Sequence, residues 1–205
     1  MNYPDFFDRL PVIRLRDPLA QFLGVNDDGV LDYRYLDAVR LAGHSCPTVA
    51  AAWNMTRLAL AALYGKELPC RGGIRVAVAG AVDEGVSGVI ASVVTLLTGA
   101  AGDGGFKGIA GQFRRRNLLA FGVEIPLELR LTRQDDGRSV DVACDTSRIP
   151  VDPAMSVLLQ RCLSGEAADD ERQLFGALWQ ERVRCLLLEH GDDQQVFPVR
   201  PAQVC

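Results

Sequence analysis

Apolar side chains recur at helical spacing in five segments of the chain. The strongest pattern covers residues 49–63 and is followed by a Tyr-Gly pair, which predicts a largely buried helix that ends there. Residues 85–97 carry a wide apolar face, and residues 33–41 predict a shorter amphipathic helix. Two further amphipathic helices are expected at residues 153–163 and 171–188. The chain should therefore be rich in helix, with a helical C-terminal section.

Four other segments show the pattern of β-strands. Residues 74–78 alternate apolar with polar or small side chains, and residues 118–121, 126–132 and 139–144 are expected to be strands as well. An Asp-Asp-Gly turn at residues 135–137 predicts a hairpin between the last two. Together with the helices, these strands predict an α+β fold in which an antiparallel or mixed sheet packs against helices.

The length of 205 residues suits one main domain with a short appendage. We expect an α+β core over residues 1–150, C-terminal helices packed on that core over residues 151–190, and a tail over residues 191–205. Because the tail contains two prolines and several polar residues, we expect it to be either extended across the surface or disordered.

Composition excludes some classes of function. The net charge of -4 and the pI near 5.2 argue against a nucleic-acid partner, because the one dense basic run is the arginine triplet at 114–116. The first ten residues lack the apolar stretch of a signal peptide, and the longer apolar stretches are too short to cross a bilayer. We therefore expect a cytoplasmic protein with no membrane partner. Its six cysteines form no C-x-x-C pair and are expected to be reduced thiols.

The sequence Gly-His-Ser-Cys-Pro at residues 43–47 is the strongest candidate for chemistry. Pro47 suits the first position of the long buried helix, which makes Cys46 its N-cap. The helix dipole and the free N–H groups at that end favour a thiolate, the form that attacks electrophiles and binds metals. His44 could aim its imidazole into the same space, and a His–Cys pair suits zinc, although two ligands do not complete a site. The alternative is structural, with Cys46 as a small buried cap and His44 bonded to a backbone carbonyl.

The 43–47 motif is followed by an apolar helix, a strand, a turn, a second helix and a glycine-rich loop with a lysine. In this order it resembles the FmdE-like family of formylmethanofuran dehydrogenase components over residues 30–122. The resemblance implies an α+β domain that tends to form a homodimer. It also implies that the His and Cys of a Gly-His-x-Cys-Pro-Gly signature line a cleft that can hold a metal such as zinc. On this basis His44 and Cys46 are candidate metal ligands.

The chain departs from that family at several positions. Thr48 replaces the second glycine of the signature, and Ala100 stands where the family commonly has a cysteine. In the motif that the family writes as Cys-Gly-Val-Asp-Ala, Ser87 replaces the cysteine and Ile90 the aspartate. By this comparison a thiol-rich site is reduced to Cys46 alone.

Two residues between the predicted strand at 74–78 and the next helix, and one in the first turn of that helix, are further candidates. Asp83 or Glu84 could complete a metal site, and Glu84 could act as a general base. Equally, an acidic pair before a helix simply complements its dipole. Ser87 could hydrogen-bond a ligand, although a serine in the first turn of a helix needs no function.

The glycine-rich stretch 102–108 contains Lys107, whose ammonium group could hold a phosphate or carboxylate together with backbone N–H groups. It is not a P-loop, because the Gly-Lys-Ser/Thr ending is absent. The arginines at 114–116 could bind an acidic substrate or lie in solvent. His190 suits a helix C-terminus, whereas Cys205 could reach a site in its own or a partner chain.

These features lead to one functional hypothesis and one alternative. In the hypothesis, a homodimer binds a divalent metal, most simply zinc, through His44 and Cys46. Cys46 and Glu84 would be catalytic, and an adjoining cleft would hold a small anionic ligand through Lys107, with Ser87 and Asp83 beside it. The alternative is a non-catalytic carrier or sensor of a metal, haem or other redox cofactor, or an accessory subunit of an oxidoreductase.

Overall fold

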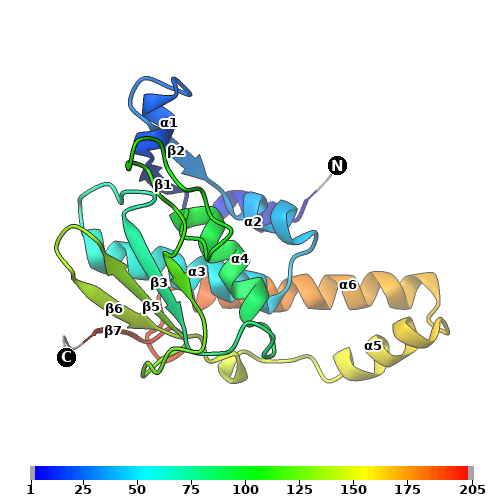
Figure 1. Cartoon of the computed structure of the whole chain (residues 1–205). Helices are drawn as coiled ribbons and strands as arrows, with labels where there is room; N and C mark the ends of the chain where they lie inside the picture. The colour runs from blue at the N-terminus through cyan, green and yellow to red at the C-terminus, as the bar shows by residue number, and fades with distance from the viewer. Residues whose placement is uncertain (1–2, 203–205) are drawn as a thin grey trace.

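A five-stranded mixed sheet with two helices against it forms the centre of the structure, a computed structural model in which residues 3–202 are described (Figure 1). The strand order is β4-β3-β5-β6-β7, and the β3–β4 pair is parallel while the other pairs are antiparallel. The strands are β3 (Ile74–Val78), β4 (Leu119–Ala120), β5 (Leu129–Arg133), β6 (Ser139–Val142) and β7 (Val199–Pro201). This arrangement, with 41% helix and 15% strand, confirms the predicted α+β fold.

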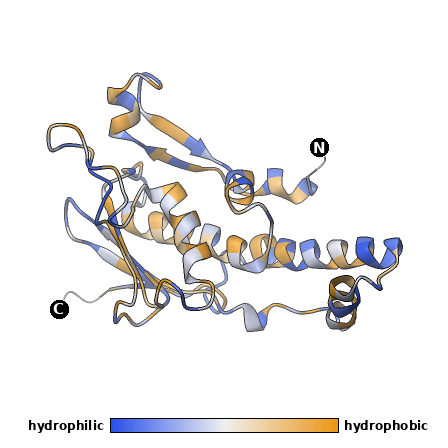
Figure 2. Ribbon diagram, turned by 45° about the vertical axis from the view of Figure 1, so that its right-hand side comes forward, coloured by the Kyte–Doolittle hydropathy of each residue, from blue (hydrophilic) through white to orange (hydrophobic). Residues whose placement is uncertain are grey.

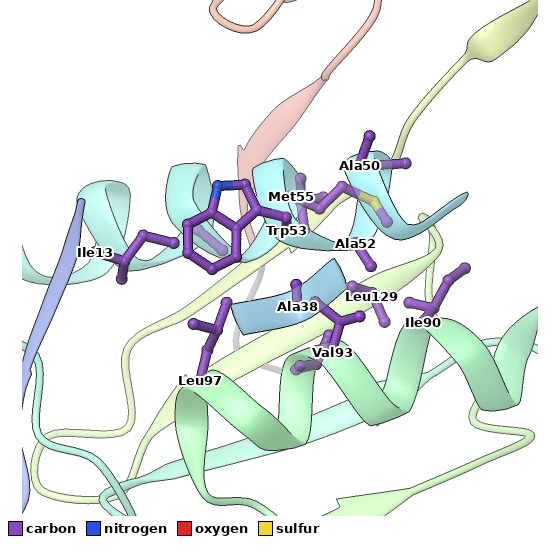
Figure 3. Packing of buried hydrophobic residues seen from close by; sticks show 14 of the residues in the cluster. Ile13, Ala38, Ala50, Ala52, Trp53, Met55, Ile90, Val93, Leu97 and Leu129 are labelled. Atoms are coloured by element: carbon purple, nitrogen blue, oxygen red, sulfur yellow. The ribbon is translucent and has the colours of Figure 1, made fainter. Parts of the chain in front are cut away.

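Helices α3 (Pro47–Tyr64) and α4 (Ser87–Thr98) pack against each other and against the sheet. The α3 helix starts with Pro47 at its first position and ends at Gly65, which has a φ of 57°. Trp53 and Met55 of α3 belong to the same cluster of buried apolar residues as Val93 of α4 (Figure 3). Apolar spacing alone therefore located both helices within a residue or two.

The N-terminal part contains elements that the sequence pattern did not predict. Strands β1 (Ile13–Arg16) and β2 (Val30–Tyr33) form an antiparallel pair, with the short helix α1 (Pro18–Phe22) between them. The turn before β2 needs Gly29, because a Cβ there would lie 2.7 Å from the Asp17 carbonyl oxygen and φ is +70°. Helix α2 (Tyr35–Ala42) then leads into the 43–47 motif, as predicted.

The C-terminal helices form a projecting arm. Helix α6 (Asp169–Arg184) contacts α3 at its inner end, whereas α5 (Met155–Ser164) contacts α6 and lies away from the sheet (Figure 1). The outer end of α6 is mostly hydrophilic (Figure 2). A π-helical turn, Cys185–Glu189, follows α6 directly, and we call it the π-turn.

The segment after the arm returns to the sheet. Val196 and Phe197 are buried, and β7 pairs antiparallel with β6, so this part of the predicted tail is anchored rather than lying free on the surface. The expectation for Cys205 concerns a residue outside the described range. Within residues 3–202, no helix is both long and apolar enough to span a bilayer.

Candidate functional site

The 43–47 motif joins α2 to α3 with the geometry that the sequence predicted. Gly43 ends α2 in the left-handed region, with a φ of 76°. Cys46 is the N-cap of α3, and its Sγ accepts a hydrogen bond from the Val49 N–H at 3.5 Å. Cys46 as a whole is half-buried, and its sulfur caps the first turn of α3.

The rest of the motif is held by the arm. The Ser45 carbonyl oxygen accepts hydrogen bonds from Trp179 Nε1 and Gln180 Nε2, both at 3.1 Å. The Ser45 hydroxyl lies 3.0 Å from the hydroxyl of the buried Tyr35. His44 is exposed, and its Nδ1 lies 2.9 Å from the Ala42 carbonyl oxygen. If Nδ1 carries the proton and donates to that carbonyl, Nε2 is the nitrogen that could bind a metal.

Asp83 and Glu84 lie on the loop between β3 and α4, and Ser87 is the first residue of α4. Asp83 and Glu84 are exposed, and Glu84 accepts a hydrogen bond from the Ala81 N–H at 3.0 Å. Ser87 is half-buried and lies so close to Gly80 that a Cβ on that glycine would be 2.3 Å from the Ser87 hydroxyl oxygen. The loop is therefore tightly folded around Gly80, with its carboxylates turned to solvent.

A small cavity of about 120 Å³ lies between the first turns of α3 and α4 and is lined by Thr48, Val86, Glu128 and Cys144, among others. Glu128 accepts a hydrogen bond from the Cys144 N–H at 3.3 Å. Burial raises the pKa of Glu128. Burial, with the nearby charges of Glu128 and Asp145, raises the pKa of Cys144 to about 12. Ionisation of both side chains beside this cavity is therefore disfavoured, and the sequence pattern had not singled out Glu128.

Lys107 lies in a different and larger pocket, of about 700 Å³, which we call the basic pocket. Its four cationic lining residues are Arg71, Lys107, Arg114 and Arg115. Arg115 is 7% exposed, although arginine is rarely buried without a partner. The structure therefore brings together Lys107 and two arginines of the 114–116 triplet, and adds Arg71, which the sequence reasoning did not single out.

One buried carboxylate fixes two of these cations. Asp17 Oδ2 lies 2.9 Å from Arg71 Nη1, and Asp17 Oδ1 lies 2.6 Å from Arg115 Nη2. Burial alone would raise the pKa of Asp17, but the hydrogen bond from Arg71 and the charge of Arg115 outweigh it, so the pKa is lowered. Asp17 also caps α1 by accepting from the Leu19 N–H at 2.9 Å. Two of the four cations that line the basic pocket are thus paired with this carboxylate.

The loop that carries Lys107, residues 102–117, closes on itself. The Asn117 N–H donates to the Gly102 carbonyl oxygen at 3.1 Å, and the N–H groups of Arg115 and Arg116 both donate to the Phe106 carbonyl oxygen. This is the arrangement of an Ω-loop. The non-glycine residues with positive φ in residues 3–202 all lie in this loop: Ala110, Phe113 and Asn117. Such conformations cost about 1–3 kcal/mol each and concentrate at binding sites.

The basic pocket and the 43–47 motif lie at opposite ends of α3. The 18 residues of this helix span about 27 Å. Cys46 caps the first end, whereas Tyr64, the last residue, hydrogen-bonds the backbone of Cys70, which lines the basic pocket. The structure therefore does not place Lys107 in a cleft adjoining His44 and Cys46.

Cys185, Glu189 and His190, at the π-turn, could hold a metal ion, because one possible ligand atom from each lies within 4.8 Å of the others. Among residues 3–202, no other group of three or more His, Cys, Asp or Glu side chains meets that distance, so His44 and Cys46 lack a clustered third donor there. The sequence predicted only a reduced thiol at Cys185 and a helix end at His190. The Cys-x-x-x-Glu-His spacing could have indicated this cluster, but the three side chains come together only if the segment forms a π-turn.

No protein-family model matches the chain, and no curated protein matches its sequence. The resemblance drawn from the 43–47 motif accordingly stays a hypothesis.

Proposed function

We propose that this protein binds a small anionic molecule, carrying a phosphate or carboxylate group, in the basic pocket. The observation that supports this most strongly is that four cations, Arg71, Lys107, Arg114 and Arg115, line one cavity. Within residues 3–202, Asp17 is the one carboxylate that forms an ion pair with any of them. Arginine presents fixed N–H donors that match carboxylate and phosphate oxygens, and lysine adds a compact charge.

The pocket is also organised before a ligand arrives. Two of its arginines are held by Asp17, and Arg71 donates further to the Leu96 carbonyl oxygen at 3.0 Å. Lys107 and Arg114 are exposed and belong to the Ω-loop, so they can adjust to a ligand. Because Asp17 holds Arg71 and Arg115 in place before binding, fewer side chains must be ordered when an anion binds.

The direct test is isothermal titration calorimetry with inorganic phosphate, pyrophosphate and succinate. Lys107→Ala and Arg114→Ala should each weaken binding of the preferred anion about tenfold or more, because a charge-assisted hydrogen bond contributes about 1.5–3 kcal/mol. Arg172→Ala, which removes an exposed arginine from the arm, is the matched control and should leave binding unchanged. Absence of binding by the wild type, or equal binding by all variants, would refute the proposal.

A metal function at the 43–47 motif is the second candidate. It rests on the half-buried Cys46 sulfur beside an exposed His44, and on the resemblance to the FmdE-like family. Zinc is the ion that this donor pair suits best. Its remaining ligands would come from solvent, a bound molecule or a second copy in a homodimer. A carrier or sensor of a metal or haem, or an accessory subunit of an oxidoreductase, is the alternative, and the exposure of His44 favours it over catalysis by Cys46 and Glu84.

Elemental analysis and absorption spectroscopy of the untagged protein test this second candidate. His44→Ala and Cys46→Ala should each lower the content of bound metal or chromophore. Equal content in the wild type and both variants would count against any metal role of the motif.

A further inference from the structure

We propose that Cys185, Glu189 and His190 form a metal site at the end of α6, separate from both the 43–47 motif and the basic pocket. The ligands would be one sulfur, one carboxylate oxygen and one imidazole nitrogen, a set that suits Zn²⁺ and similar divalent ions. Possible ligand atoms of the three side chains already lie within 4.8 Å of one another.

The π-turn is what brings the third residue to the cluster. In an α-helix, residue i+4 lies almost above residue i, but residue i+5 is turned away by about 140°. Here the His190 N–H donates to the Cys185 carbonyl oxygen at 3.1 Å, an i to i+5 hydrogen bond that widens the turn. Glu189 and His190 can therefore both lie beside Cys185, and π-turns are found frequently at functional sites.

Neighbouring charges orient the two polar ligands. Arg184 pairs with Glu189 Oε1, and the other carboxylate oxygen, Oε2, lies 3.4 Å from Cys185 Sγ. His190 Nδ1 lies 3.3 Å from Asp193 Oδ2. A carboxylate on the second ring nitrogen is the usual partner of a metal-binding histidine. Asp193 is therefore a positioning residue rather than a ligand in this proposal.

The backbone around the cluster is anchored to the core. The carbonyl oxygen of Gly191 accepts hydrogen bonds from Asn54 Nδ2 at 2.7 Å and from Arg57 Nη2 at 2.9 Å, both side chains of α3. A Cβ at Gly191 would lie 2.3 Å from the Leu187 carbonyl oxygen, so only glycine fits there. The ligands thus sit on a turn that is fixed on both sides, as a metal site requires.

Three protein ligands leave one position of a tetrahedral ion open. Cys185 also lines a cavity of about 350 Å³ between α6 and the segment before α5, with Asp152, Glu181 and Arg182 on its walls. A ligand on the open position of the metal could enter from this cavity. The site is therefore of the open type that binds an exchangeable water or small ligand rather than the closed structural type.

The test is calorimetric titration of Zn²⁺ into metal-free, reduced protein carrying Cys46→Ser, so that the 43–47 motif cannot contribute its thiolate. This background should still bind Zn²⁺ at one site. Adding Cys185→Ser should lower the affinity by about 100-fold or more, and Asp193→Asn by about 10–100-fold, the range for partners that orient ligands. With Co²⁺ as the probe, only chains that retain Cys185 should show the near-ultraviolet band of a thiolate ligand.

Cys162→Ser, which removes a thiol of α5, is the matched control and should behave like its parent. Circular dichroism establishes that each variant is folded. If the Cys46→Ser protein binds no Zn²⁺, or binds it equally well after Cys185→Ser and His190→Ala, the π-turn site does not exist. That result would leave the anion proposal untouched, since phosphate binding at the basic pocket is measured separately.

Discussion

The two ends of α3 differ in charge and in the way they are built. At the Pro47 end, Cys46 caps the helix and the adjoining cavity contains Glu128 and Cys144, both with raised pKa values. At the Tyr64 end, four cations line the basic pocket, and Asp17, which pairs with Arg71 and Arg115, has a lowered pKa. Burial disfavours ionised groups at the Pro47 end, whereas several charged side chains lie together at the Tyr64 end. A motif that is conspicuous in the sequence thus lies at the end with fewer binding groups.

The largest expected effect of a single substitution lies at the basic end. Asp17→Ala would leave Arg71 and Arg115 without their shared carboxylate, and breaking a buried ion pair costs about 3–5 kcal/mol. The free energy of unfolding from urea titration measures this. Asp32→Ala is the control, because it removes an exposed ion pair with Arg14 and should change stability by at most about 1 kcal/mol. Equal losses in the two variants would show that Asp17 does not organise that end.

A smaller effect is expected in the pH dependence of stability, to which Asp17 and Glu128 should contribute with opposite signs. The lowered pKa of Asp17 means that its contribution to stability is present above the ordinary value of 3.8 and is lost as the pH falls through the folded-state value. The raised pKa of Glu128 means the reverse. Its contribution is present below the ordinary value of 4.5 and is lost as the pH rises through the folded-state value.

Substitution of Glu128 should reveal the direction in which its contribution to stability changes with pH. Glu128→Gln keeps the shape of the side chain but removes the ionisation, so its melting temperature relative to wild type should be higher at pH 7 than at pH 4. Glu124→Gln, which alters an exposed carboxyl group, is the control and should show no such trend. If the relative melting temperature changed with pH in the same way in both variants, or in the reverse direction in Glu128→Gln, burial would not disfavour the charged form of Glu128.

Elements whose cause is local could be predicted from the sequence. The α3 helix and its cap follow from an apolar period, a proline at the first position and a terminal glycine, and strand β3 was located at residues 74–78. Lys107 was singled out because its ammonium group and the N–H groups of a glycine-rich loop could together hold an anion, and this role stays a prediction.

Features that depend on contacts between distant residues could not be predicted. Asp17 meets Arg71 across 54 residues and Arg115 across 98. The arginine triplet drew attention to Arg115, but nothing in the sequence pairs it with Asp17. The β1–β2 pair and β7 are short and gain their stability from packing. The π-turn has no local signature, because its i to i+5 hydrogen bond competes with ordinary α-helix and is fixed here by contacts of Gly191 with α3.

The most direct measurement is the phosphate or pyrophosphate affinity of three proteins compared by calorimetry: the wild type, the double variant Lys107→Ala/Arg114→Ala, and His44→Ala. If the basic end of α3 is the anion site, the double variant should lose about 100-fold or more in affinity, and His44→Ala should bind as the wild type does. An anion that binds the double variant unchanged, or that is lost with His44→Ala, would contradict the assignment of binding to the basic pocket.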